Sequence, residues 1–244
     1  MVFVIVASHD KLANMNIRYV SVVVAVLLLV GGALWYASQT ALYPFELAAE
    51  DSISSWDFKG LYSGNSELEK KARADIKRLN GMFGTEGNTD YILDVSIAGV
   101  YELLGDGAKE YEYLRRALAE DSEKTGLAWY NLGTLLVRLG AFGSARTAYA
   151  KAAMAQPELD QYQTRYLEFL TQQFPTDENA IEKAFADASV GSTQSSTLLQ
   201  IRARWLEGEG RIKDAIADWK KISELSPAST SAVNSEIRRL EGQP

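Results

Sequence analysis

The sequence predicts an all-α protein: an N-terminal transmembrane helix, an α-solenoid of antiparallel helix pairs and a C-terminal capping helix. Three observations lead to this prediction. Residues 19–37 form an unbroken run without charge, apolar residues recur at helical spacing from residue 66 onward, and residue types repeat about every 35 residues after residue 90. Helical spacing that repeats with such a period is typical of stacked helix pairs with a continuous core.

The composition excludes several kinds of catalytic site. The chain has 244 residues, of which 47% are apolar, and it contains no cysteine and a single histidine, His9. Disulfides, thiolate nucleophiles, iron–sulfur clusters and cysteine zinc sites are therefore excluded. Because His9 precedes the apolar run, histidine bases, catalytic triads and histidine-ligated metals are excluded from everything after it. We expect no metal and no cofactor.

The run at 19–37 is long enough to span a membrane. At about 1.5 Å per residue in a helix, roughly twenty apolar residues cross a hydrocarbon core about 30 Å thick. Tyr19 begins the run and Trp35 and Tyr36 lie at its end, where aromatic rings favour the two membrane interfaces. The sequence therefore predicts contact with the lipid bilayer through residues 19–37.

The charges on either side of this run predict its orientation. Lys11 and Arg18 precede it, whereas the charged residues that follow it are acidic as far as Asp51. By the positive-inside rule, residues 1–18 form the cytoplasmic tail of a single-pass protein of the cytoplasmic membrane, and the body lies outside. Two alternatives remain open: a signal peptide cleaved after small residues near the end of the run, and translation from Met15.

The formal net charge of −7 is divided unevenly along the chain. Residues 1–45 carry +1, which leaves −8 on residues 46–244. An acidic body repels the phosphates of nucleic acids and the headgroups of anionic lipids. We therefore expect partners that are proteins, in a membrane or envelope complex, and no nucleic acid.

Two segments lie between the apolar run and the repeats. Residues 38–65 form a connector whose second half is predicted to pack on the helices through Trp56, Phe58, Leu61 and Tyr62. Residues 66–90 comprise a helix that begins at Ser66 and ends at Asn80-Gly81, followed by a loop. The apolar face of this helix contains Leu68, Ala72, Ile76 and Leu79.

The segment 91–229 repeats. Gly105 recurs 35 residues later as Gly140 and a further 70 residues later as Gly210, so a degenerate copy lies between the last two. The best-formed copy runs from Trp129 to Pro157, and the others cover 91–124, 161–195 and 196–229. Residues 230–244 form a capping helix with Val233, Ile237 and Leu240 on its apolar face.

The best-formed copy has a tryptophan, a Leu-Gly pair, a turn glycine, two alanines on either side of an aromatic residue, and a closing proline. These residues are Trp129, Leu132, Gly133, Leu136, Gly140, Ala145, Tyr149, Ala152 and Pro157. In this order and spacing they resemble the tetratricopeptide repeat (TPR) family, in the membrane-anchored form of bacterial envelopes. The resemblance covers about 140 residues, with one strong copy and three partial ones.

The TPR pattern has physical reasons. Gly133 and Ala145 are small enough for the two helices of a pair to cross closely, with Tyr149 filling the space beside the crossing. Gly140 permits the bend between the helices. Pro157 ends the second helix because it has no backbone N–H to donate.

The carboxylates predict no catalytic pair. Asp94, Glu102, Glu110 and Glu120 recur at helix-like intervals, and charges with this spacing are usually found on exposed helix faces. The glycines at 105–107 and 208–210 lie at predicted turns between helices, so they do not indicate a phosphate-binding loop. We therefore expect that the protein is not an enzyme.

The TPR resemblance implies a peptide-binding groove. In such arrays the first helix of each pair lines a concave surface, and by resemblance that surface here contains Tyr130, Asn131, Thr134, Arg138, Arg165, Tyr166, Phe169, Gln200 and Arg204. Asn131 would hold a ligand backbone by a paired amide contact, and the arginines would meet acidic groups. The lysines and asparagines that clamp chaperone tails are missing, since Tyr130 and Thr134 stand at two of those places.

Together these features predict a scaffold or assembly factor anchored in the membrane and displayed on its extracytoplasmic side. The layout is similar to bacterial envelope proteins such as the ancillary subunit of the Sec translocon and the repeat domain of cytochrome c maturation factors. Two alternatives remain open. One is a cytosol-facing receptor for protein import or targeting, and the other is an envelope enzyme that uses only carboxylates.

Overall fold

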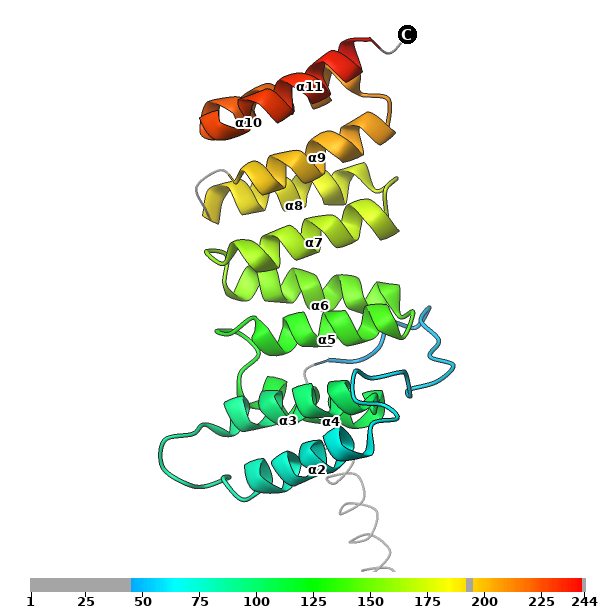
Figure 1. Cartoon of the computed structure of the whole chain (residues 1–244), viewed down its shortest axis with the longest axis vertical. Coiled ribbons are helices and arrows are strands. Elements are labelled where there is room, and N and C mark those ends of the chain that lie inside the picture. The colour runs from blue at the N-terminus through cyan, green and yellow to red at the C-terminus, as the bar shows by residue number, and fades with distance from the viewer. Residues whose placement is uncertain (1–44, 192–194, 243–244) are drawn as a thin grey trace, which may run out of the picture. The chain divides into compact units, whose positions relative to one another are not determined.

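The structure is a computed structural model that describes residues 45–191 and 195–242. The predicted membrane span at 19–37 and the tail before it lie outside these ranges, and among the described helices none is long and apolar enough to cross a bilayer. The described ranges contain ten α-helices and one short 3₁₀-helix (Figure 1). They are α2 (Ser66–Asn80), α3 (Asp90–Leu104), α4 (Gly107–Glu120), α5 (Leu127–Arg138), α6 (Phe142–Ala155), α7 (Asp160–Gln173), α8 (Glu178–Gly191), α9 (Ser196–Gly208), α10 (Ile212–Leu225), η1 (Pro227–Ser229) and α11 (Thr230–Glu241).

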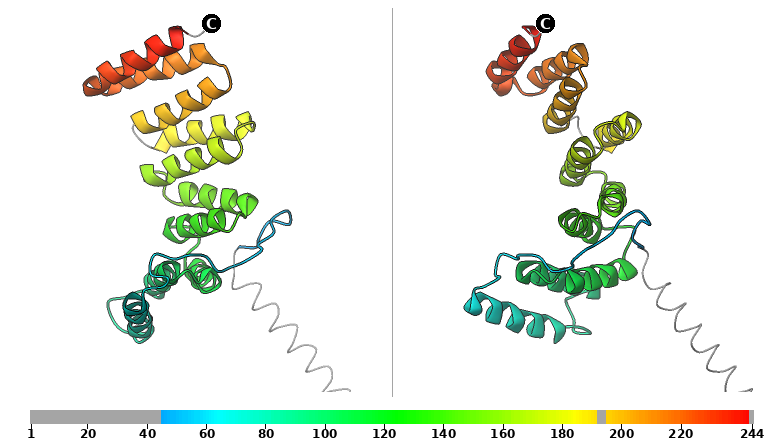
Figure 2. Two further views of the ribbon diagram at one scale, coloured as in Figure 1. Left: turned by 45° about the vertical axis from the view of Figure 1, so that its right-hand side comes forward. Right: turned by 90° about the vertical axis from the view of Figure 1, so that its right-hand side faces the viewer.

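The helices from α3 to α10 follow one another as pairs joined by short turns, which confirms the all-α prediction for the described ranges (Figures 1 and 2). Contacts are densest within the pairs α3–α4, α5–α6 and α9–α10. The α7–α8 pair is looser, and α9 packs against α7. This looser pair is the degenerate copy of the repeat.

The crossing of α5 and α6 follows the predicted packing. A methyl group added at Gly133 would lie 2.7 Å from the ring of Tyr149, so only glycine fits there. Ala145 and Tyr149 are both fully buried. Gly140 has a φ of 77°, a conformation that glycine adopts without strain.

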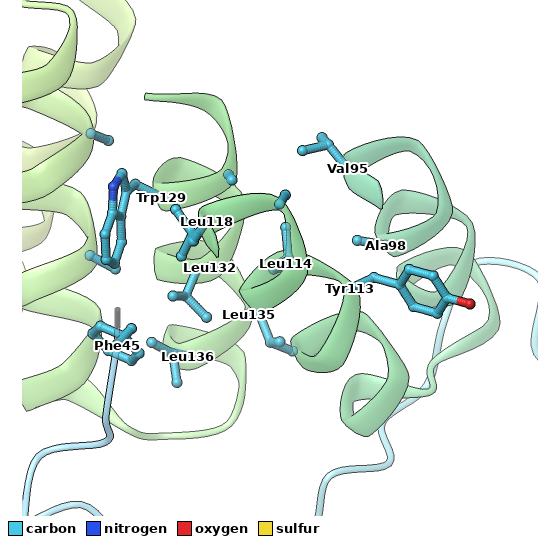
Figure 3. Close-up of a cluster of buried hydrophobic side chains, with 14 of the residues drawn as sticks. Phe45, Val95, Ala98, Tyr113, Leu114, Leu118, Trp129, Leu132, Leu135 and Leu136 are labelled. Carbon is cyan, nitrogen blue, oxygen red and sulfur yellow. The ribbon is translucent and has the colours of Figure 1, made fainter. Parts of the chain in front are cut away.

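The buried side chains form two hydrophobic clusters. The first joins α2–α7 and includes Trp129, Leu132 and Tyr149, and Figure 3 shows a part of it around Phe45 and Trp129. The second joins α7–α11 and includes Trp219. The first and the last helices lie where the sequence predicted them, and their apolar faces contribute Leu79 of α2 and Leu240 of α11 to these clusters.

Residues 45–65 pack along α3–α6 and are called the strap below (Figure 2). Phe45 is 4% exposed, and its ring centroid lies 5.7 Å from that of Trp129. Trp56 lies against Tyr111 of α4 with centroids 4.9 Å apart. The prediction that Leu61 packs on the helices is wrong, since it is 81% exposed. The most buried strap residue belongs to the first half of the segment, which has no helical period to reveal it.

Two glycines let the strap approach the turn between α3 and α4. Phe58 donates its N–H to the carbonyl of Gly105 at 3.0 Å, and Gly107 donates to the carbonyl of Trp56 at 3.0 Å. Gly105 has a φ of 83°, and a methyl group added to it would overlap the carbonyl oxygen of Phe58. A methyl group at Gly60 would overlap the backbone of this turn in the same way. Gly105 therefore allows the close approach of the strap as well as the bend between α3 and α4.

The strap also supplies the cap of α6. The carboxylate of Asp51 accepts hydrogen bonds from the N–H groups of Gly143 at 3.1 Å and Ser144 at 2.6 Å. Ala48 donates its N–H to the hydroxyl of Ser144 at 2.8 Å. The residue before α6 is an alanine that makes no side-chain cap, so Asp51 satisfies N–H groups that the helix itself leaves open.

Candidate functional site

The predicted groove residues lie on the first helices of three consecutive pairs. They are Tyr130, Asn131, Thr134 and Arg138 of α5, Arg165, Tyr166 and Phe169 of α7, and Gln200 and Arg204 of α9. Without Tyr166 and Phe169, and with Glu168 of α7, which was not predicted, these residues make a set of eight side chains that we call the A-helix face. They divide into three groups with different surroundings.

The first group is centred on the hydroxyl of Tyr149, which reaches from α6 to α5 and α7. Thr134 Oγ1 lies 3.2 Å from this hydroxyl, and Arg165 donates to it from Nε at 3.1 Å. The ring of Tyr130 lies between Tyr149 and Tyr162, with centroids 6.0 and 5.4 Å away. Three of the predicted residues, Tyr130, Thr134 and Arg165, therefore come together around Tyr149. Their contacts join α5 to α7.

The second group lines a hollow between α7 and α9. Its volume is about 490 Å³, and Glu168, Gln200 and Arg204 contribute polar groups beside the indole of Trp205. The side chain of Arg204 is 55% exposed, and its closest carboxylate oxygen, on Glu236, is 3.9 Å away. A loosely paired arginine next to a carboxylate and an amide can bind a polar peptide segment without giving up a buried ion pair.

The third group contains Arg138, which is held by its own chain. Its guanidinium donates to Glu102 at 2.8 Å and lies 4.4 Å from the ring centroid of Phe58 in the strap. The prediction treated Arg138 as open to an acidic ligand, but a partner would have to displace Glu102 to reach it. Asn131 is half-buried, and its amide makes no hydrogen bond within 45–191 and 195–242.

Two predicted groove residues point elsewhere. Phe169 is 2% exposed and packs between Tyr149 and Phe174, with centroids 5.2 and 5.8 Å away. It belongs to the core and is closed to a ligand. Tyr166 lines a different hollow, between α6 and α8. Both errors come from the degenerate copy, where the repeat pattern is too weak to fix which side of α7 faces the groove.

Two carboxylates of the first pair are buried, contrary to the expectation that these charges lie on exposed faces. Glu110 is 3% exposed, and burial, together with the nearby charge of Glu102, raises its pKa to about 8 against the opposing effect of Arg138. Asp94 is 2% exposed, and burial raises its pKa to about 6 although Arg116 lies 3.0 Å away. In the described part of the chain, no cluster of side chains is suited to hold a metal ion.

Sequence reasoning missed Phe45 and Asp51 of the strap and the hollow between α6 and α8. Phe45 and Asp51 act on helices that follow them by 80 residues or more, and no local pattern carries that information. The one available signal was the cluster of aromatic residues around Trp56, which correctly indicated packing for the second half of the segment.

Comparisons with known proteins support the fold. No protein-family model matches the sequence, and no curated protein matches it. The structure is similar to the crystal structure of MamA, a protein that contains TPRs, with a TM-score of 0.52 and 14% sequence identity over 68% of this chain and 95% of that one. At this identity the likeness shows the fold alone. The chain therefore has a TPR-like fold.

Proposed function

We propose that this protein is a scaffold that binds segments of partner proteins along its A-helix face. The observation that carries the proposal is the hollow between α7 and α9, where Glu168, Gln200 and Arg204 stand together on a row of helices that in a TPR-like fold forms the binding side. A partner segment would place a carboxylate or a backbone carbonyl on Arg204 and an amide on Glu168. The half-buried amide of Asn131 extends the surface toward α5.

The proposal includes anchoring in the membrane through residues 19–37, with the helices on the extracytoplasmic side. The support for anchoring is the length of the uncharged run and the basic residues before it. An anchor would hold the scaffold at the membrane, where it could bring membrane partners together. The protein would then act as an assembly factor for a membrane or envelope complex.

Photocrosslinking in the cells that make the protein tests the binding face. A photoreactive amino acid at Gln200 should capture a partner protein, because this residue lines the hollow. Arg204→Glu should reduce the yield at least tenfold, since it reverses the charge at the site. Arg238→Glu, on the exposed side of α11, is the matched control and should leave the yield unchanged. The proposal fails if capture at Gln200 does not exceed background.

Protease protection tests the topology. In sealed cells stripped of any outer barrier, added protease should digest the helical body, whereas the cytosol-facing alternative predicts protection until the membrane is broken. Deletion of 19–37 should release the protein from membranes washed with alkaline carbonate. Digestion only after lysis would contradict the extracytoplasmic placement while leaving the binding proposal standing.

A further inference from the structure

A second hollow lies on the other side of α7 from the A-helix face, between α6 and α8. Its volume is about 650 Å³, within the range of sites that hold ligands. Its walls are mostly small or apolar and include Ala150 and Met154 of α6 and Ala180 of α8, and its floor is formed by Gln163 and Tyr166 of α7. We call it the α6–α8 groove.

The α6–α8 groove is equivalent to the place that the strap occupies one pair earlier. Alignment of the helices pairs α4 with α6 at a shift of 35 residues, α5 with α7 at 34 and α6 with α8 at 36. The strap contacts Tyr111, Trp129, Gly143 and Ser144, whose equivalents are Arg146, Gln163, Asn179 and Ala180. All four equivalents line the α6–α8 groove.

A hydrogen bond supports this alignment independently. Trp129 donates from its indole nitrogen to the carbonyl of Ser122 at 2.8 Å. Its equivalent, Gln163, donates from its amide to the carbonyl of Ala153 at 2.8 Å and also to that of Pro157 at 3.4 Å, and Pro157 is the equivalent of Ser122 at a shift of 35. The two floors therefore share this contact to the segment before the helix, and one of them is covered by Phe45.

The two places differ in what an occupant must supply. At α6 the strap provides a carboxylate as the helix cap, but α8 is already capped by Asp177, which accepts from the N–H of Ala180 at 3.2 Å. The rim charges of the groove are also paired within the chain, Arg146 with Asp177 at 2.8 Å and Lys183 with Asp187 at 2.6 Å. An occupant therefore needs an apolar anchor and no charge of its own.

We propose that the α6–α8 groove binds an extended segment of a partner protein that inserts an aromatic side chain against Gln163 and Tyr166, as Phe45 does against Trp129. The chain's own Phe45 is buried in its own pair and cannot reach this groove, and we assign the groove to a segment of another protein. Met154, which is 73% exposed at the rim, provides an adaptable apolar contact for the residues beside the anchor. This inference rests on the proposed scaffold function but uses a different face.

Crosslinking from the groove tests the proposal in the full chain in its own cells. A photoreactive amino acid at Lys183, on the rim, should crosslink to a segment of another protein that contains an aromatic residue, identified by mass spectrometry of the joined peptides. Ala150→Trp fills the groove and should lower the yield at least tenfold. Ala186→Trp places the same side chain on an exposed position of the same helix as Lys183 and should change the yield less than twofold.

Further outcomes are decisive in either direction. Met154→Glu, at an exposed position that tolerates charge, should also lower the yield, so the test does not depend on the folding of Ala150→Trp.

In the partner, alanine in place of the aromatic residue should abolish the crosslink. A crosslink to a second copy of this chain, or one that Ala150→Trp leaves intact, would overturn the proposal. Capture at Gln200 without capture at Lys183 would reject this groove and keep the scaffold function, whereas capture at neither position would reject both.

Discussion

Helices α6 and α8 hold equivalent places in consecutive pairs, yet they are attached to their neighbours differently. In the pair α5–α6 two buried positions hold the small residues Gly133 and Ala145, whereas the equivalent positions of α7 and α8 hold Leu167 and Ile181, both buried. Larger side chains at a crossing keep two helices farther apart. The α7–α8 pair is accordingly looser, and the groove beside it stays open.

Ion pairs tie α8 to the helices that follow it. Arg202 of α9 donates two hydrogen bonds of 2.7 Å to Asp218 of α10 and one of 3.3 Å to Glu182 of α8, with its guanidinium 3.8 Å from the ring centroid of Phe185. A repeat without small residues at its crossing can thus be held in the array by charged side chains instead of close packing. The array then remains continuous across its degenerate copy.

The largest effect is expected from Arg202→Ala. Asp218 is 4% exposed, and removal of its partner leaves a buried charge uncompensated, which costs about 3–5 kcal/mol in the free energy of unfolding. Chemical denaturation followed by circular dichroism measures it. The double variant Arg202→Leu with Asp218→Leu should recover much of the loss. A loss below about 1 kcal/mol for Arg202→Ala would show that packing, and not this ion-pair network, joins α8, α9 and α10.

The second largest effect should be a dependence of the free energy of unfolding on pH, and its source should be the buried carboxylates of the pair α3–α4. Glu110 has a folded pKa of about 8, above its ordinary value, so the folded state binds the proton more tightly than the unfolded state does. Its contribution to stability is complete at low pH and declines as the pH rises toward 8, by at most about 3 kcal/mol between pH 5 and 7. Denaturation at a series of pH values measures the decline.

Glu110→Gln is the control for this prediction. The amide is neutral at every pH, so the fall in stability above pH 6 should disappear. The contribution of Asp94, whose folded pKa is about 6, should remain and should be lost mainly between pH 4 and 6. An unchanged profile in Glu110→Gln would show that Glu110 does not carry the effect.

Ala145→Leu should have a smaller effect, about 1–3 kcal/mol, because it overpacks the crossing of α5 and α6. At the equivalent position of the looser pair the residue is already large, and Ile181→Leu, which conserves volume, should cost less than about 1.5 kcal/mol. Thermal unfolding of the two variants measures the difference between the pairs. A loss for Ala145→Leu no larger than that for Ile181→Leu would mean that the α5–α6 crossing has room for a larger side chain and is not closely packed.

Asp51→Ala should have the smallest effect, about 1 kcal/mol, since it removes the cap of α6. Asp177→Ala removes the cap that α8 makes for itself and should cost a similar amount. Hydrogen exchange should separate the two variants: Asp51→Ala should speed exchange in the strap as well as in the first turn of α6, whereas Asp177→Ala should speed exchange in α8, and near its ion-pair partner Arg146, but not in the strap. Slow exchange of the strap in Asp51→Ala would show that Phe45 and Trp56 hold it unaided.

The helices and the α5–α6 crossing could be predicted because their signals are local. Apolar spacing places a helix face, and the spacing between Gly133 and Ala145 matches two helices joined by one turn. The burial of Glu110 could not be predicted, because it depends on packing by α3 and α5 around a side chain whose type normally faces water. Of the candidate site, Gln200 and Arg204 came together in one hollow. Phe169 did not, because the repeat register shifts by a residue in the looser pair.

The cap that Asp51 provides has a consequence for how the chain folds. Contacts in a helical array of this kind are short in sequence, and each pair depends only on its neighbours. The bonds from Asp51 close a loop of 92 residues, which raises the contact order of one end of the protein above that of the rest. The strap should therefore dock after the pairs beneath it have formed, and once docked it joins the first two pairs into a single cooperative unit.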